Sequence, residues 1–588
     1  MSILRISLVL CFIIVFQVIF CEASTDKEFE ELGRRYVDEF PGLSPVSATL
    51  LGDHRYDHEL NHVTAESRSR QVNFYRRYLK EIDGIDANDL SRANQIDHAL
   101  LGHRLRAQLW QQEELQEWAW NPLNYTSLTG NSIYGLVARD FAPIEKRLSC
   151  VADRMEEFPM LFMQIRATLE PERVPKVHVE TAIKQNPGVL SILNNMVKPH
   201  MDKLSRAERK RLKKAMATGR RAVKEHQKWL ESELLPNAGG EFRIGAELYD
   251  KKLELTLQTS LSRKELRERA EEELRSIRAK MYEIAKDVYK KQNPYTVFPD
   301  QPTKSYMQAI IRSVLELAYR QTPLRDEVVA TAKESLKTTE SFVREKDLVT
   351  IPPDPIDIII MPEFQRGVSI AYCDSPGVLD VGQQTFYAIA PLPEDWTDKQ
   401  VGSFLREYNL RSIHNLTIHE AMPGHFLQIA HSNRYPGKLR SVLSSDVFIE
   451  GWAVYTEHMM CEQGFLDNDP LMHLIVLKWY LRSIANAIID QAIHVDGMSR
   501  DEAMQLMIEE TFQEEREAAA KWTRAQLTSV QLSTYFVGFQ EHRDMIRKIR
   551  RAWGEEFDLK KYHDKVLSFG SPPVKYVQAL LLDEDIPH

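Results

Sequence analysis

The stretch TIHEAMPGHFLQIAH, residues 417–431, decides how the centre of this chain is built. It places His419 and His425 six positions apart, with Pro423 and Gly424 between them. On a regular α-helix, residues six apart lie roughly 120° from a common face, so the two imidazoles would not meet. Proline cannot donate to a preceding carbonyl, and glycine tolerates unusual dihedral angles. The two residues therefore predict a kink or bulge that turns His425 back toward His419.

Two histidines and a neighbouring carboxylate are the parts of a zinc hydrolase site. Such a site needs two neutral imidazoles on the metal and a carboxylate next to the reacting water. His419 and His425 supply the imidazoles, and Glu420 supplies the carboxylate. On a following helix, Glu450 is a candidate third ligand, and Glu457 lies seven residues later on nearly the same face. We therefore predict one Zn²⁺ ion held by His419, His425 and Glu450, with Glu457 behind a ligating histidine.

Composition outside this stretch favours helix. The chain has 588 residues, of which 43% are hydrophobic and 27% charged, and this excludes a disordered, collagenous or polytopic membrane protein. Only 24 of the 588 residues are glycine, about 4% where ~7% is usual. Gly424, directly beside a proposed ligand, is therefore notable. The net charge of −9 excludes a global positive field, and we predict no nucleic-acid partner.

Apolar spacing predicts a mainly α protein with one small β patch. Helical patterns run from residue 26 to about 233, and the loop LPNAGG, Leu235 to Gly240, is the best candidate boundary. Residues 349–360 and 384–390 read as short strands, and helical pattern resumes near Asp398. We therefore predict an N-terminal helical region, 24–240, and a helical catalytic region, 241–588, with a β patch at about 349–390 beside the site.

The N-terminus is typical of a secretory signal. Arg5 precedes the apolar run Ile6 to Phe20, and Cys21-Glu22-Ala23 ends in small residues suited to cleavage. An uncleaved anchor is the alternative, but the run is shorter than the ~20 residues that span a bilayer. A lipoprotein modified at Cys21 is disfavoured by the bulky Phe20. We predict a signal peptide over residues 1–23, export to the periplasm or the extracellular space, and no stable membrane insertion after cleavage.

The two motifs resemble those of the thermolysin-like gluzincin peptidases, where a zinc-binding helix is followed by a helix carrying the glutamate ligand. The closer resemblance is to the family catalogued as domain of unknown function 885, whose hallmark is HExxPGH followed by EGWA. Supporting segments run along most of the chain: LGDHRYD (51–57), FYAIA (386–390), RSIANAIIDQAIH (482–494), TYFVG (534–538) and FDLKKYHDKVLSFGSPPV (557–574).

The resemblance implies a mostly helical, zincin-like fold with its metal in a central cleft. By residue it implies that His419, His425 and Glu450 are ligands and that Glu420 is the general base. Tyr535 matches the family pattern for a residue that stabilises the oxyanion, and a buried structural tyrosine is an equal alternative. Aminopeptidase activity does not follow, because the chain carries HExxPGH and has no GxMEN-type motif.

Further side chains are candidates for substrate binding. If strand 385–389 is an edge strand, its backbone could pair with an extended peptide and Tyr387 would line the cleft. Arg482, Asp490 and His494 fall near one helical face, where they either bind a substrate carboxylate or form an interhelical network.

Three further histidines lie four residues apart, but the sequence around them favours a loop over a second metal site: His54, His58 and His62.

These observations predict an exported zinc-dependent metallopeptidase acting on a peptide substrate. A zinc hydrolase of another amide or an ester is the first alternative, since the same metal and base would serve it. A non-catalytic binding protein is the second, and the intact Glu420 argues against it.

Overall fold

The computed structural model describes residues 25–366 and 369–587. Helices account for most of the described chain and one small sheet for its strands, so the prediction of a mainly α fold with a β patch is confirmed. Within these residues, no helix has the length and apolar character needed to cross a membrane. The predicted signal peptide lies outside the described residues.

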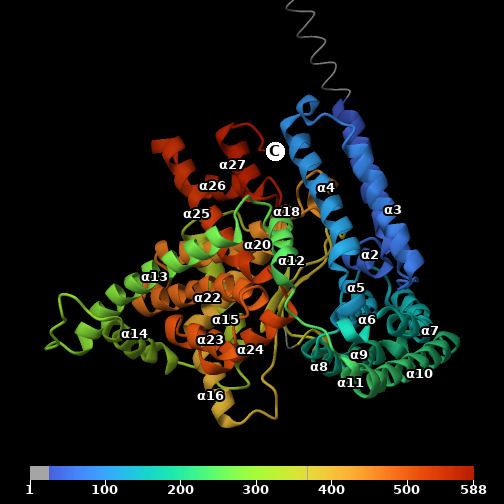
Figure 1. Ribbon diagram of the computed structural model, residues 1–588, viewed down its shortest axis with the longest axis horizontal. Coiled ribbons are helices and arrows are strands. Elements are labelled where there is room, and N and C mark those ends of the chain that lie inside the picture. The colour runs from blue at the N-terminus through green and yellow to red at the C-terminus, as the bar shows by residue number, and fades with distance from the viewer. Residues whose placement is uncertain (1–24, 367–368, 588) are drawn as a thin grey trace, which may run out of the picture.

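The N-terminal helices form a group on one side of the molecule (Figure 1). It begins with a helix over residues 25–39. The longer helices that follow are α3 (Ala65–Ile82), α4 (Arg92–Trp110), α6 (Pro122–Val137), α7 (Ile144–Thr168) and α10 (Arg206–Trp229). The shorter ones are α2 (Pro45–Leu51), α5 (Glu117–Trp120), α8 (Lys176–Gln185), α9 (Gly188–Ile192) and α11 (Leu235–Asn237).

The remaining helices form the larger group on the other side, with α12 and α18 near the middle of the view (Figure 1). Before the candidate site come α12 (Gly245–Leu257), α13 (Arg263–Gln292), α14 (Lys304–Tyr319), α15 (Val328–Glu345) and α16 (Asp398–Glu407). The site region holds α17 (Leu410–Glu420), α18 (His425–Ser432), α19 (Lys438–Val442), α20 (Asp446–Glu462), α21 (Phe465–Asn468) and α22 (Pro470–His494). The chain ends with α23 (Arg500–Gln505), α24 (Glu515–Leu527), α25 (Thr534–Trp553), α26 (Leu559–Leu567) and α27 (Val574–Leu582).

Each group has its own apolar core, and a third core joins them. The N-terminal core draws on residues 46–238 and takes in Phe364 from the other group. The larger core runs from Tyr249 to Val577 and encloses the site helices. The third core packs α3, α4 and the first helix against Leu439 and α27, so the two ends of the chain lie together, as Figure 1 shows for α4 and α27.

The predicted boundary loop is partly helical. After α10 the helix continues through a π-helical turn, Leu230–Leu234, into α11. The connecting loop therefore begins at Ala238 and not at Leu235. Apolar Leu230 and Leu234 are fully buried, which explains why the helix extends this far despite Pro236.

The β patch is a three-stranded sheet in the order β1-β3-β2. β1 (Ile356–Ile360) pairs parallel with β3 (Thr385–Ile389), and β2 (Ala371–Asp374) pairs antiparallel with β3. The first strand is shorter than predicted, since residues 349–355 contain prolines and stay outside it. β3 is the central strand and not an edge strand, because β2, which the sequence did not predict, covers its second side. The condition for pairing residues 385–389 with an extended peptide is therefore not met.

The N-terminal helices hold this sheet in place. Tyr134 of α6 donates to a carboxylate oxygen of Asp374 at 2.6 Å, and Arg139 donates to the other at 3.0 Å. Arg139 also bonds the carbonyl of Gln384, just before β3. A Cβ at Gly377 would lie 2.1 Å from the backbone of Leu51, so the loop before β3 packs directly on the end of α2.

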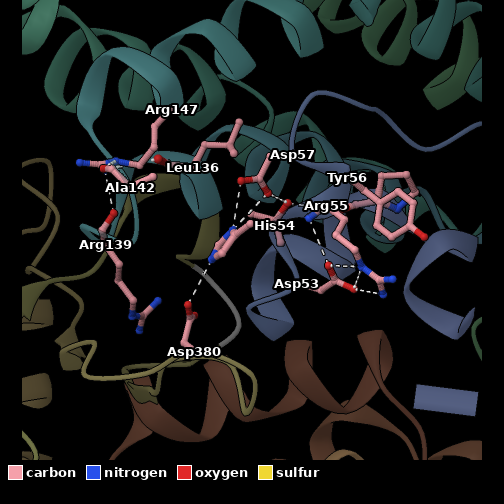
Figure 2. A network of polar contacts seen from close by, with 12 residues as sticks. Asp53, His54, Arg55, Tyr56, Asp57, Leu136, Arg139, Ala142, Arg147 and Asp380 are labelled. Carbon is pink, nitrogen blue, oxygen red and sulfur yellow. Dashed lines mark hydrogen bonds and ion pairs between the residues drawn. The ribbon is translucent and has the colours of Figure 1, made fainter. Parts of the chain in front are cut away.

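A histidine completes this attachment (Figure 2). His54 bonds Asp57 through Nδ1 at 3.0 Å and Asp380 through Nε2 at 3.1 Å, and its ring stacks on Phe141 with centroids 3.6 Å apart. Burial works to lower the pKa of His54, but the hydrogen bonds to Asp380 and Asp57 outweigh it and raise the pKa to about 9. His54 thus ties the N-terminal helices to the loop before β3.

Candidate metal centre

The helix that carries His419 and Glu420 stops between the two histidines. α17 ends at Glu420, α18 begins at His425, and the Met422–Pro423 peptide bond is cis. A Cβ at residue 424 would lie 2.0 Å from the carbonyl oxygen of His419, so only glycine fits there. The predicted disruption at Pro423 and Gly424 is a complete break between two helices, not a bulge within one.

The break brings the two imidazoles together at Glu450. His419 Nε2 lies 3.5 Å and His425 Nε2 lies 3.4 Å from the same oxygen of Glu450, Oε2. The two rings are edge-on, with centroids 4.7 Å apart. One donor atom from each residue lies within 4.8 Å of the others, and this is the one such group of three found among the described residues.

Glu457 fixes the orientation of His419. It accepts from His419 Nδ1 at 2.7 Å. Glu450 and Glu457 therefore face α17 from the same side of α20. Its other oxygen accepts from the amide of Asn415 at 2.7 Å, so both carboxylate oxygens are engaged. With a proton held on Nδ1, the lone pair of His419 Nε2 points toward Glu450.

The three residues fit a metal ion. Glu450 Oε2, the oxygen that both imidazoles face, is buried, and no hydrogen bond to it is found in the described chain. Two histidine nitrogens and one carboxylate oxygen are donors that Zn²⁺ prefers in a catalytic site. Burial works to raise the pKa of Glu450, but the imidazoles of His419 and His425 facing its carboxylate hold it well below its usual value. The charged carboxylate favours a cation.

Glu420 lies between this group and the sheet. Its carboxylate receives a backbone hydrogen bond from Cys373 of β2, and burial raises its pKa above the ordinary value. Tyr387 of β3 is fully buried close to Glu420, and burial raises its pKa well above the usual value. Tyr387 is therefore packed beneath Glu420 and does not present its ring to solvent.

Tyr535 lies beside His419, with the two ring centroids 6.3 Å apart. The crossing of α20 and α25 places it there, because Gly451 and Gly538 meet with no room for a side chain: a Cβ at Gly451 would lie 2.3 Å from the Gly538 carbonyl carbon. Its hydroxyl accepts from Arg524 at 3.0 Å and from Gln531 at 3.3 Å.

Arg482, Asp490 and His494 do not form one group. Arg482 pairs with Glu517 at 2.6 Å. Asp490 is fully buried and accepts from Tyr249 at 3.1 Å. His494 bonds the backbone carbonyls of Ala525 and Thr528. The interhelical network is therefore the alternative that the structure supports for Asp490 and His494.

The histidines near residue 54 do not meet at a second site. His54 is bound on both sides, as described above, while His58 and His62 are exposed. His431 bonds the carbonyl oxygen of Thr350 and lies outside the group of three.

The sequence patterns did not predict four residues that lie near the site: Asn415, Cys373, Lys521 and Arg524. Lys521 and Arg524 share with Glu517 the spacing of one helical face, and this spacing was the available signal.

Known proteins resemble this chain over almost its whole length. The model of the family described as "Bacterial protein of unknown function (DUF885)" matches residues 45–581. No curated protein matches. Among solved structures, a "putative lipoprotein of unknown function" from Shewanella oneidensis is 31% identical, covering 94% of this chain and 99% of its own, with a TM-score of 0.77.

A second solved structure, the "putative lipoprotein" from Colwellia psychrerythraea, shows the same fold at lower identity. It is 19% identical, the match covers 95% of this chain and 99% of the Colwellia chain, and the TM-score is 0.75. The resemblance to domain of unknown function 885 is confirmed by the family match, and the chain belongs to this family of bacterial proteins of unknown function.

Proposed function

We propose that this protein is an exported, zinc-dependent hydrolase that cleaves peptide bonds. The observation that carries the proposal is the convergence of His419, His425 and Glu450, whose donor atoms lie within 4.8 Å of one another. Glu457 orients one imidazole, and Glu420 stands beside the group as an unpaired carboxylate base. A purely structural cluster would not need this last residue.

Each residue has a chemical task in that proposal. Zn²⁺, when held by the three residues, supplies a Lewis acid that polarises the scissile carbonyl and makes a water more acidic. Glu420 accepts the water's proton and delivers it to the leaving nitrogen, and its raised pKa suits a group that must do both. The Cys373 N–H keeps its carboxylate oriented.

Tyr535 is suited to the developing oxyanion. Its hydroxyl oxygen accepts from Arg524 and Gln531. A phenol hydroxyl has one proton to donate, and with its acceptor side occupied that proton remains for the substrate oxygen.

Export is supported by two independent observations. The apolar run of residues 6–20 behind Arg5 is typical of a signal sequence. The 31% identical relative from Shewanella oneidensis is described as a "putative lipoprotein of unknown function", which is consistent with an envelope or secreted location.

Metal content and peptide hydrolysis of the purified protein test the proposal. The wild type is expected to hold one zinc per chain, and His425→Ala to lose it because a ligand is removed. Glu420→Gln is expected to keep zinc and lose roughly 10²–10⁴-fold in peptide hydrolysis. His431→Ala is the matched control, since His431 bonds only a backbone carbonyl, and it should retain both properties.

The outcomes separate the alternatives. Full zinc in His425→Ala would show that the ligands are misassigned, and a wild-type rate in Glu420→Gln would remove the proposed base. Turnover of esters or non-peptide amides alone would favour the other hydrolase class.

A further inference from the structure

One face of α24 carries charges that its neighbours do not balance. Glu517, Lys521 and Arg524 are spaced four and three residues apart, so their side chains lie along the same side of the helix. This side faces Arg482 of α22 and Tyr535 of α25. We call Arg482, Lys521 and Arg524 the cationic face.

The single carboxylate on this face is already engaged. Glu517 Oε1 accepts from Arg482 at 2.6 Å, and Glu517 Oε2 accepts from the Tyr408 hydroxyl at 3.1 Å. Glu407, the other acid whose charge acts on Lys521, is paired with Lys478 at 2.8 Å. Arg482 is therefore neutralised, and two cations remain.

Lys521 is the clearest sign of a missing anion. The residue is only 4% exposed, yet no hydrogen bond or ion pair to its ammonium group is found in the part of the chain that the structure describes. Burial, and then the proximity of Arg482 and Arg524, place its pKa well below the ordinary value. Lysine is almost never buried unless it is paired, because an unpaired buried charge is costly.

Arg524 is in a similar position. Its Nη2 donates to neutral acceptors, Gln531 at 2.9 Å and the Tyr535 hydroxyl at 3.0 Å. Its Nε is buried, and no partner for it is found among the described residues. A guanidinium normally binds a carboxylate through two parallel hydrogen bonds, and no carboxylate that is hydrogen-bonded to Arg524 is found among the described residues.

The cationic face begins at the metal centre. Arg524 bonds the hydroxyl of Tyr535, whose ring lies 6.3 Å from the ring of His419. Arg524 is also close enough to Glu450 for their charges to interact. An anion held by Lys521 and Arg524 would therefore belong to a molecule that also reaches the three candidate metal ligands.

We propose that Lys521 and Arg524 bind a carboxylate of the substrate, so that the metal centre acts on peptides carrying a negative charge near the scissile bond. This inference rests on the proposed peptidase function. The carboxylate has two possible sources, the free C-terminus of the peptide or an Asp or Glu side chain. Both offer the same acceptor geometry to the two cations.

Binding to the full-length Glu420→Gln protein, measured by calorimetry, tests the proposal without turnover. Three forms of one alanine-rich peptide serve as probes: the free acid, the C-terminal amide, and the amide with one glutamate at successive positions. We expect the free acid or one glutamate peptide to bind about tenfold or more tightly than the neutral amide. Which of the two does so identifies the source of the carboxylate.

Variants on α24 assign that preference to residues. In the same background, Lys521→Met should abolish most of the preference, and Lys521→Arg should keep it. Arg516→Met is the matched control on the same helix, because Arg516 lies over Trp396 away from the cationic face. Lys521→Met is also expected to unfold at a higher temperature, since it removes a buried unpaired charge; Lys521→Gln replaces it if the methionine variant does not fold.

The two proposals fail in different ways. Equal binding of all three peptide forms, or an unchanged preference in Lys521→Met, overturns the carboxylate site even if the wild type hydrolyses peptides. A carboxylate preference that Lys521→Met removes, in a protein that cleaves none of the peptides, supports the site and overturns the peptidase function.

Discussion

The groups around His54 and around His419 both combine histidine with carboxylates, but they differ in whether the histidine's two ring nitrogens are both hydrogen-bonded. His54 is bound by Asp57 and Asp380, one at each ring nitrogen, and its ring stacks on Phe141. His419 also gives Nδ1 to a carboxylate, that of Glu457, but its Nε2 faces an oxygen of Glu450 that His425 Nε2 approaches equally.

The two groups differ in which polar atoms are left without a hydrogen-bond partner among the described residues. Around His54 both ring nitrogens have a partner, so the group is complete as an ion pair that joins two parts of the chain (Figure 2). Around Glu450, two imidazoles and one carboxylate oxygen point at a common position. Residue types alone would not separate a structural histidine from a candidate ligand; the unpaired atoms do.

The largest expected effect comes from Gly424→Ala, which breaks the arrangement that unites the ligands. Its Cβ would lie 2.0 Å from the His419 carbonyl oxygen, so the start of α18 must move and His425 with it. We expect zinc affinity to fall more than about 100-fold and stability to fall by roughly 3 kcal/mol, measured by metal titration and urea unfolding. Gly402→Ala in α16, where nothing lies within 4 Å, should leave zinc affinity unchanged and raise stability by about 0.5–1 kcal/mol.

A smaller effect is expected from Glu457→Gln, which removes the negative charge that lies behind the His419 imidazole. The amide can still accept a hydrogen bond but supplies no charge behind the imidazole. Zinc affinity should fall by roughly 10–100-fold with the fold intact. Glu462→Gln, exposed near the end of the same helix, is the control. Unchanged affinity in Glu457→Gln would mean that the His419–Glu457 bond is structural, as for His54.

The smallest effect is expected from His54→Gln, and it should depend on pH. The pKa of His54 is raised from 6.5 to about 9, so its contribution to stability is complete below pH 6.5 and is lost as pH rises through about 9. The variant should be less stable by about 1–2 kcal/mol at low pH, allowing for partial solvent screening. This pH-dependent difference should disappear above pH 9 and leave the smaller, constant loss of the ring stacking on Phe141.

Urea unfolding across this pH range measures the difference, with zinc content followed in parallel. His58→Gln is the control, because the His58 side chain is 62% exposed. A difference between His54→Gln and the wild type that does not shrink as pH rises through about 9 would contradict the ion-pair account. Loss of zinc would show that the two groups are coupled.

The part of the site that the sequence predicted is the part that lies close together along the chain. His419, His425, Glu450 and Glu457 belong to three neighbouring helices, and their spacing, with Pro423 and Gly424, was enough to propose one site. The mainly α class followed from composition and apolar spacing in the same way.

The rest depended on contacts between distant segments. Whether 385–389 is an edge strand depends on β2, a short strand with a weak pattern of its own. The different partners of Arg482 and His494 are set by the packing of α24, and the lack of a partner for Lys521 is visible only once Glu517 is seen to be occupied. Spacing predicts which residues share a face, but not which of them is already neutralised.

The attachment of the sheet to the N-terminal helices has a consequence for the order in which the site forms. The candidate ligands come from helices close in sequence, whereas the surroundings of Glu420 depend on His54 and Asp380, 326 residues apart, and on Tyr134 and Asp374, 240 residues apart. Contacts between distant residues close large loops and form slowly. During refolding, zinc should therefore be captured before hydrolytic activity appears, and the interval should measure how long the N-terminal helices take to close over the sheet.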